Sequence, residues 1–183
     1  PGGLKPVFAA WFVPGRITRS FREHHPPFFV AIPWLYNALL SVKDAGPEDF
    51  EGLRYAVSGA EPLPDAVSGQ FFQRFGVRIS EGYGLSETAP ATNICLAHNF
   101  RAHSVGPPLP EIEQVIVDPG TGEHLPPNTD GEIRMRGPNV MHGYFKLPED
   151  TANAFDTQGY LKTGDIGRQD DDGFLYITGR LKE

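Results

Sequence analysis

The stretch that decides the fold, residues 53–88, reads LRYAVSGAEPLPDAVSGQFFQRFGVRISEGYGLSET. Its first segment, Leu53–Ser58, has the apolar composition of a buried strand. After a Gly–Pro turn, apolar residues recur at helical spacing as far as Phe75, and Gly76 is the expected stop. Val77–Ser80 predicts a second strand that leads into a glycine-rich loop. Strand, helix and strand, with loops at the carboxyl ends of the strands, predict a parallel α/β sheet.

The sequence before this stretch continues the same pattern. Phe28–Ile32 is a short apolar run that predicts a further strand, and Pro33 can open the helix that follows it. Together these segments predict a partial α/β subdomain over residues 1–104.

The sequence after Ser104 changes character. It contains β-rich segments separated by turn clusters, and these segments are Glu113–Val117, Gly131–Arg136 and Phe174–Thr178. One short helix is expected at Pro148–Phe155, because proline and acidic residues favour a first helical turn. The overall fold class is therefore α/β, with a small β-barrel subdomain over residues 105–183 following the parallel part.

Composition excludes several classes of protein. The 183 residues carry a formal net charge of −7, which argues against a nucleic-acid partner because such binding needs a basic face. No apolar run approaches the ~20 residues that span a bilayer, and no secretory signal opens the chain. The single cysteine, Cys95, excludes an internal disulfide and suits a reducing, cytoplasmic location. The acidic charge also fits poorly with an ATP site unless other segments supply positive charge.

The loop from Glu81 to Thr88 could carry chemistry. A flat ligand could stack on Tyr83, Ser86 can donate to a phosphate oxygen, and Glu87 offers the hard oxygen that Mg²⁺ prefers. The alternative is a plain glycine-rich turn with a packed tyrosine and a solvated glutamate.

Four further segments share the order and spacing of one family. They are Ser58–Leu63, Gly131–Gly137 with Gly143–Tyr144, Tyr160–Asp165 and Gly179–Glu183. Together with the loop Glu81–Thr88, which we call the tyrosine loop, they resemble the successive core motifs of the AMP-forming acyl-CoA synthetase, adenylation-domain and luciferase superfamily. The resemblance covers nearly the whole chain, from Val30 to Glu183.

The resemblance implies a nucleotide site for ATP and its product AMP. Tyr83 matches the ring that stacks on adenine, and Asp165 matches the carboxylate that accepts hydrogen bonds from both ribose hydroxyls. Arg180 matches a residue near the ribose and phosphates. The turn formed by Gly59, Ala60, Glu61 and Pro62 matches the strip of backbone that lines the adenine, and we call it the adenine strip. Gly82 and Gly84, on either side of Tyr83, match further backbone positions next to the nucleotide.

The resemblance also implies catalytic and hinge residues. Ser86 stands where the family usually has threonine and keeps the hydroxyl for the α-phosphate, whereas Glu87 matches the Mg²⁺-binding carboxylate. Lys182 matches the hinge about which a C-terminal lid rotates.

An acyl pocket is expected between the segment before the adenine strip and the tyrosine loop. Its expected residues are Ile32, Trp34, Ser58, Ala89 and Pro90. Trp34 could form a floor or gate of this pocket, and the competing interpretation is ordinary core packing.

The reaction implied by the family has two halves. A carboxylate attacks the α-phosphate of Mg-ATP to give an acyl-adenylate and pyrophosphate, and the thiol of coenzyme A then takes the acyl group and releases AMP. Positioning and charge neutralisation carry such chemistry, so no nucleophilic triad is required. The family's phosphate loop and C-terminal lid are not recognisable here. We therefore expect an internal fragment with little activity of its own, which also accounts for the acidic charge.

The leading hypothesis is a fatty acyl-CoA ligase, because the Ser58–Pro62 and Gly179–Glu183 variants look more like those ligases than like peptide-synthetase modules. An acyl-acyl-carrier-protein synthetase, a peptide-synthetase adenylation module and a non-catalytic nucleotide-binding relative remain alternatives. Membrane association of the parent enzyme stays open. Three further features are given structural interpretations: His24–His25 as a solvated turn, Cys95 as a small buried residue and Asp170–Gly173 as a hairpin turn.

Overall fold

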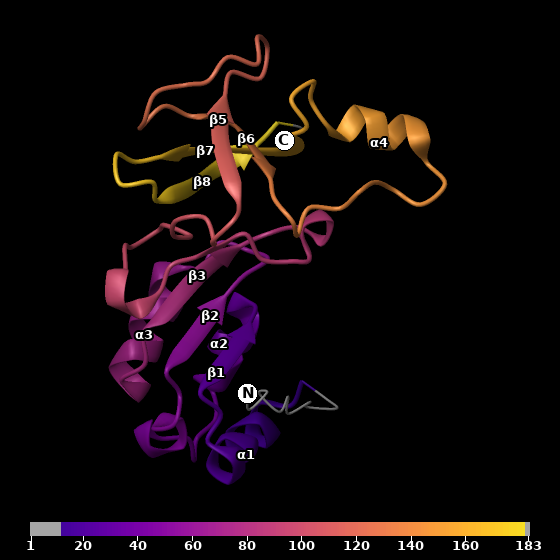
Figure 1. Ribbon diagram of the computed structural model, residues 1–183. Coiled ribbons are helices and arrows are strands. Elements are labelled where there is room, and N and C mark those ends of the chain that lie inside the picture. Colours follow the sequence, from indigo (N-terminus) through magenta and orange to yellow (C-terminus); the bar gives the residue numbers. More distant parts are fainter. Residues whose placement is uncertain (1–11, 182–183) are drawn as a thin grey trace. The chain divides into compact units, whose positions relative to one another are not determined.

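The computed structural model describes residues 12–181, which fall into two compact units divided between Ile79 and Ser80 (Figure 1). The first unit contains α1 (Pro14–His24), β1 (Phe28–Ala31), α2 (Pro33–Leu39), β2 (Tyr55–Ser58) and α3 (Asp65–Phe75). The second unit contains most of β3 (Ile79–Tyr83), together with β4 (Asn93–Ile94), β5 (Glu113–Val117), β6 (Gly131–Arg136), α4 (Pro148–Ala154), β7 (Leu161–Gln169) and β8 (Leu175–Arg180). Short 3₁₀ turns lie at Pro47–Phe50, Ser86–Thr88 and Ala97–Asn99. The predicted α/β fold class is confirmed.

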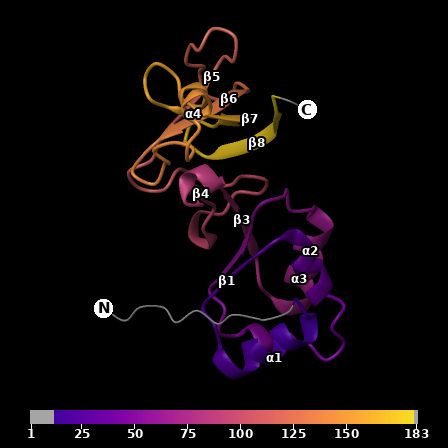
Figure 2. The same cartoon turned by 90° about the vertical axis from the view of Figure 1, so that its right-hand side faces the viewer.

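The first unit is built on a parallel strand pair. β1 and β2 pair in register from Phe28 opposite Tyr55 to Ala31 opposite Ser58. Helix α2 lies in the connection between them, which is how parallel strands are joined. Helices α2 and α3 lie together on one side of β1 (Figure 2). The predicted strand and the helix opened by Pro33 are both present.

An aromatic cluster forms the core of the first unit. Phe50, Phe71 and Phe75 pack with ring centroids 4.5–5.5 Å apart. Tyr36 is fully buried beside them, and its hydroxyl donates to the Val57 carbonyl at 3.0 Å. This bond ties α2 to β2, and burial raises the pKa of the Tyr36 hydroxyl.

Helix α3 follows the sequence prediction closely. It ends at Gly76, which has a φ of 70° and donates its N–H to the Phe72 carbonyl at 2.9 Å. This left-handed conformation is the one that glycine adopts without a Cβ penalty. The helix therefore ends at Gly76 because glycine tolerates this conformation, as the sequence indicated.

Gly69 lies in the middle of α3, and no heavy atom lies within 4 Å of the position that a Cβ would take. Gly69→Ala is expected to stabilise α3 by about 0.5–1 kcal/mol, because alanine loses less backbone entropy on folding. Hydrogen–deuterium exchange of α3 in the full-length enzyme should slow accordingly. Gly76→Ala is the control of opposite sign, and faster exchange in Gly69→Ala would contradict the prediction.

One face of the first unit's strand pair is apolar and largely exposed, with Val57 as its buried member. Phe28 and Val30 are exposed on alternate positions of β1, and Phe28 lies 5.9 Å from the ring of Tyr55 on β2. Parallel sheets are normally covered on both faces. The described residues of this unit cover only the other face, where Phe29 packs into the core.

The second unit contains a four-stranded antiparallel sheet in the order β5-β6-β7-β8. The sequence predicted a small β-barrel here, whereas the described residues form this open sheet, in which β5 and β8 are edge strands. Its core is made by side chains that project from successive strands and from the segment before β5, namely Val105, Ile116, Ile133, Met135, Leu161 and Leu175. Helix α4 lies to one side of the sheet (Figure 1).

Several strand and helix boundaries differ from the sequence prediction. Strand β1 ends one residue earlier than predicted, and β2 begins two residues later. The predicted strand Val77–Ser80 is instead β3, Ile79–Tyr83, because Gly82 and Tyr83 pair with β4. The first residues of the predicted tyrosine loop are therefore strand. Strand β8 begins one residue later than predicted and continues to Arg180, and α4 ends one residue earlier.

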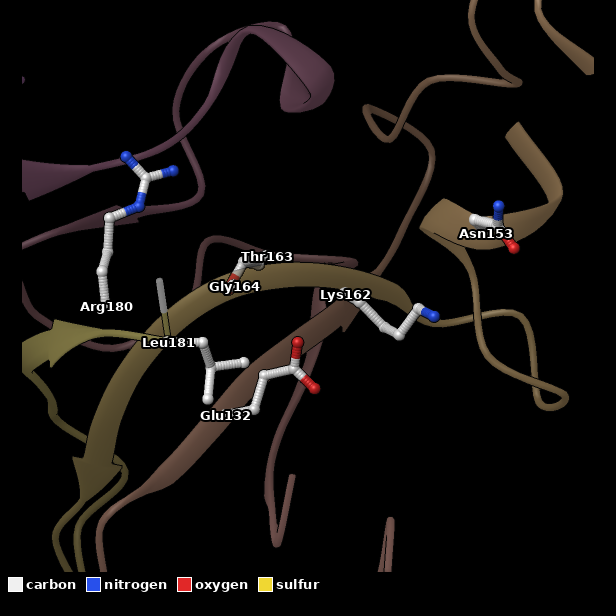
Figure 3. A pocket seen from close by; sticks show the side chains of 7 residues that line it. All are labelled: Glu132, Asn153, Lys162, Thr163, Gly164, Arg180 and Leu181. Atoms are coloured by element: carbon white, nitrogen blue, oxygen red, sulfur yellow. The ribbon is translucent and has the colours of Figure 1, made fainter. Parts of the chain in front are cut away.

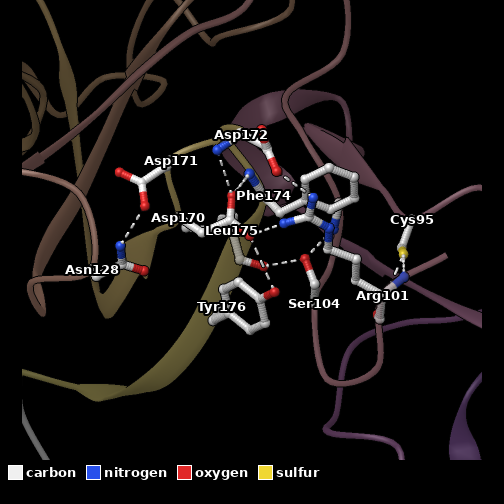
Figure 4. A network of polar contacts seen from close by, with 11 residues as sticks. Cys95, Arg101, Ser104, Asn128, Asp170, Asp171, Asp172, Phe174, Leu175 and Tyr176 are labelled. Atoms are coloured by element: carbon white, nitrogen blue, oxygen red, sulfur yellow. Dashed lines mark hydrogen bonds and ion pairs between the residues drawn. The ribbon is translucent and has the colours of Figure 1, made fainter. Parts of the chain in front are cut away.

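The acidic run Asp170–Gly173 forms the turn between β7 and β8, as predicted. Arg101 makes ion pairs with Asp170 and Asp172, and its guanidinium lies 4.0 Å from the centroid of the Phe174 ring (Figure 4). Burial opposes ionisation of Asp170, but the backbone N–H groups of Phe174 and Asp172, with Arg101, hold its pKa below the ordinary value. The network fastens the segment around Arg101 to the β7–β8 turn.

Cys95 is fully buried in the second unit, as predicted. The Arg101 backbone N–H lies 3.2 Å from its sulfur, and burial raises the pKa of the thiol. Within residues 12–181, no helix has both the length and the apolar composition that crossing a bilayer requires.

Candidate functional site

Three of the predicted nucleotide-site residues lie together in the second unit. The Tyr83 hydroxyl donates to Asp165 Oδ2 at 2.6 Å, and Arg180 Nε pairs with Asp165 Oδ1 at 3.0 Å. Asp165 is 8% exposed, whereas the Arg180 side chain is largely exposed. Burial and the neighbouring carboxylate raise the pKa of Tyr83, so its hydroxyl remains a donor at neutral pH. We call Tyr83, Asp165 and Arg180 the carboxylate cluster.

The sheet explains how the carboxylate cluster forms. Asp165 on β7 stands directly opposite Arg180 on β8 in the strand register. Gly164 has a φ of 72°, and its carbonyl accepts a hydrogen bond from the Leu181 N–H at 2.9 Å. The Asp165 N–H donates to the Thr163 hydroxyl, which in turn donates to the Ile133 carbonyl. The Thr163–Gly164–Asp165 segment therefore fixes the position of the Asp165 carboxylate through its backbone conformation and the hydrogen bonds of the threonine hydroxyl.

Ser86 and Glu87 lie on the 3₁₀ turn that follows β3. Ser86 is exposed, and Glu87 is half-buried. The Tyr144 hydroxyl donates to Glu87 Oε1 at 2.9 Å. This hydrogen bond to the carboxylate raises the pKa of Tyr144. Tyr144 is part of the Gly143–Tyr144 motif, but the sequence predicted no role for its hydroxyl.

A close backbone approach surrounds Gly84. A Cβ at Gly84 would lie 1.7 Å from the Pro90 carbonyl oxygen, so no larger residue fits without moving the backbone. Ala89 has a φ of 48°, in the left-handed region that is unfavourable for alanine. Strain of this kind is characteristic of segments held for function, which agrees with a role for residues 84–90.

Other predicted residues lie in the first unit. Gly59 donates its N–H to the Ala31 carbonyl at 3.2 Å, and the turn through Ala60, Glu61 and Pro62 is exposed. Ala60 has a φ of 71°, a second strained alanine in a predicted site segment. The adenine strip is thus a surface turn at the end of β2.

The expected pocket residues of the first unit differ in burial. Ser58 is 1% exposed, and its hydroxyl oxygen has no hydrogen-bond partner in the described part of the chain. Ile32 and Trp34 are 42% and 55% exposed. Trp34 is therefore not packed into a core by the described residues, and its role in an acyl pocket remains a prediction. Lys182, the predicted hinge, lies outside the described residues.

A cavity of ≈ 640 Å³ lies in the second unit (Figure 3). It is lined by Glu132, Asn153, Lys162, Thr163, Gly164, Arg180 and Leu181. Lys162 and Arg180 bring positive charge to this cavity, and Arg180 also belongs to the carboxylate cluster. Glu132 brings a negative charge to the same cavity, so its lining is of mixed charge.

The fold and the carboxylate cluster together define an α/β protein that carries a buried carboxylate held between a tyrosine hydroxyl and an arginine. The sequence model of the AMP-binding enzyme family matches residues 3–145 of the chain. The chain belongs to the AMP-binding enzyme family, and so to the adenylate-forming superfamily that its motifs resemble.

Several CoA ligases are similar to the chain in sequence. The chain is 36% identical to a long-chain-fatty-acid–CoA ligase of Bacillus subtilis, over 99% of this chain and 32% of the relative. It is 35% identical to 4-coumarate–CoA ligase 1 of Oryza sativa, over 88% of this chain and 30% of the relative. Among solved structures, apo MatB from Rhodopseudomonas palustris matches with a TM-score of 0.88 and 31% identity, over 94% of this chain and 34% of MatB. The chain thus spans about a third of the length of these proteins.

Proposed function

We propose that this chain is the nucleotide-binding part of an AMP-forming acid–CoA ligase. The full-length enzyme would activate a carboxylic acid with Mg-ATP to an acyl-adenylate and pass the acyl group to coenzyme A, releasing AMP and pyrophosphate. The observation that carries this proposal is the carboxylate cluster. A buried carboxylate between a tyrosine hydroxyl and an arginine retains lone pairs on both oxygens, which suits two ribose hydroxyls.

Glu87 fits the proposed Mg²⁺ site by the chemistry of its donor. Within residues 12–181, no group of three or more His, Cys, Asp or Glu side chains is placed to hold a metal. Mg²⁺ is often held by one or two carboxylates together with nucleotide phosphates. A single half-buried carboxylate therefore suits a cation that arrives with ATP. When bound, the cation would neutralise phosphate charge.

We propose a fatty acid as the carboxylic substrate. The similarity to the Bacillus subtilis ligase, which extends over 99% of this chain, supports this choice. So does the exposed apolar surface near Ile32 and Trp34. An aromatic acid is the second candidate, because the rice 4-coumarate–CoA ligase has a similar identity.

Pyrophosphate release by the full-length enzyme tests the proposal. It should be measured with acetate, octanoate, palmitate, 4-coumarate and amino acids, each with coenzyme A, with an acyl carrier protein, and with neither acceptor. Release with octanoate or palmitate, together with a CoA thioester, is the expected result. Selective release with 4-coumarate would move the substrate class to aromatic acids. Thioester formation on a carrier protein alone would change the acceptor, and no release with any acid would refute the enzymatic proposal.

A further inference from the structure

The Glu87 carboxylate is held by a residue far along the sequence. Tyr144 lies 57 positions away and donates its hydroxyl to Glu87 Oε1 at 2.9 Å. Glu87 Oε2 accepts no hydrogen bond within residues 12–181. The contact therefore occupies one carboxylate oxygen and leaves the other for a different ligand.

Tyr144 lies in the segment before α4 and is itself fixed by a contact with that helix. Its backbone N–H donates to the Thr151 hydroxyl at 2.9 Å, and that hydroxyl donates to the Leu147 carbonyl at 2.8 Å. A Cβ at the preceding Gly143 would lie 2.5 Å from the Thr151 side chain, so the backbone packs closely there. The phenol is therefore presented to Glu87 from a constrained backbone, although its ring is partly exposed.

The same segment also holds the backbone beside Glu87. The Met141 N–H donates to the Glu87 carbonyl at 2.7 Å. The Asn139 amide donates to the carbonyls of Thr88 at 2.7 Å and Ala91 at 3.1 Å. Both the main chain and the side chain of Glu87 are thus hydrogen-bonded to residues 139–144, which a chance surface contact would not produce.

We propose that Tyr144 is a positioning residue for the cation that accompanies ATP. Its hydroxyl holds the Glu87 carboxylate in one rotamer, with Oε2 presented to the Mg²⁺ of the nucleotide. A glutamate otherwise loses considerable side-chain entropy when it is ordered. Hydrogen bonds to metal-binding carboxylates reduce this cost and orient the ligand. This inference rests on the proposed function, because it requires a Mg-ATP site at Glu87.

Tyr144→Phe tests the inference, because it removes only the hydroxyl. Tyr160→Phe is the matched control, since the Tyr160 hydroxyl also donates to a glutamate, Glu113 Oε2, at 3.2 Å in the same unit. Binding of ATP to the full-length variants should be measured by calorimetry over a range of Mg²⁺ concentrations. Acid and coenzyme A are left out, so no turnover occurs.

The expected result is an apparent Mg²⁺ affinity about 10-fold weaker in Tyr144→Phe, with ATP binding in the absence of Mg²⁺ unchanged. Pyrophosphate release should then recover at high Mg²⁺ concentration, which a general loss of structure would not allow. Tyr160→Phe should match the wild type in both assays.

Three outcomes would overturn the inference. Identical Mg²⁺ dependence in wild type and Tyr144→Phe would show that the hydroxyl does not position the carboxylate. Equal weakening in Tyr144→Phe and Tyr160→Phe would indicate a general effect of losing a tyrosine hydroxyl. If the wild type binds no ATP at any Mg²⁺ concentration, the proposed function fails and the role of Tyr144 fails with it.

Discussion

Asp165→Ala in the full-length enzyme is expected to lower kcat/KM for ATP on the order of 100- to 10,000-fold. A hydrogen bond to a charged group contributes roughly 1.5–3 kcal/mol, and the proposed site loses two such bonds to the ribose. The substitution also leaves Arg180 and the Tyr83 hydroxyl without their shared partner. Steady-state pyrophosphate release at varied ATP concentration measures the effect.

Two variants separate the role of Asp165 from general damage. Asp165→Asn keeps the shape and one acceptor oxygen, so it should retain more activity than alanine but less than wild type. Asp130→Ala removes an exposed carboxylate of the same unit, which pairs with Arg168 at 3.2 Å, and should change kcat/KM little. Equal activity in Asp165→Ala and Asp130→Ala would contradict the assignment of the ribose site.

Local features of the fold were predictable because local chemistry determines them. Helix α3 shows its apolar spacing and its glycine stop directly in the sequence, and the structure confirms both. The predicted end of β3 was wrong because the extent of a strand depends on its partner strand. Gly82 and Tyr83 are strand only because β4 lies alongside them.

The exposure of Trp34 was harder to predict for a related reason. A tryptophan next to a strand is usually covered, and its burial depends on what packs over β1. In the first unit the described residues leave one face of the strand pair exposed. Sequence periodicity identifies an apolar face, but it does not identify the residues that cover it.

The candidate site likewise combines features that the sequence predicted with contacts that it could not predict. Motif order predicted Tyr83, Asp165 and Arg180 as functional residues, and the structure brings these three together. The hydrogen bond between Tyr144 and Glu87 joins side chains 57 residues apart, and nothing in local composition indicates such a pairing. The Met141 N–H that holds the Glu87 carbonyl belongs to the backbone and therefore carries no sequence signal.

The stability of the second unit depends on a buried ion network centred on Arg134. Its guanidinium contacts Glu132 Oε2 at 2.8 Å and Asp156 Oδ2 at 3.1 Å. Arg134 and Glu132 are 9% and 4% exposed. Burial disfavours the charged form of Asp156, but the N–H groups of Tyr160 and Gln158, with Arg134, hold its pKa below 3.8.

Arg134→Met is therefore expected to destabilise the second unit by about 3–5 kcal/mol. Methionine fills similar space, so the loss comes mainly from leaving the buried Glu132 carboxylate without a counter-charge. Hydrogen–deuterium exchange of β6 and β7 in the full-length enzyme reports the change as faster opening of these strands. Removing both charges in Arg134→Met/Glu132→Gln should recover much of the loss, because no uncompensated glutamate remains.

An exposed ion pair provides the comparison that isolates burial as the cause. Arg168→Met removes the same charge from a pair with Asp130 that is nearly half exposed, and should cost about 0–1 kcal/mol. Acid should reduce the difference between wild type and Arg134→Met. The lowered pKa of Asp156 means that its stabilising contribution is present above the ordinary pKa of an aspartate and is lost as the pH falls through its folded-state pKa. Equal effects of Arg134→Met and Arg168→Met at neutral pH would show that the network contributes no more than a surface pair.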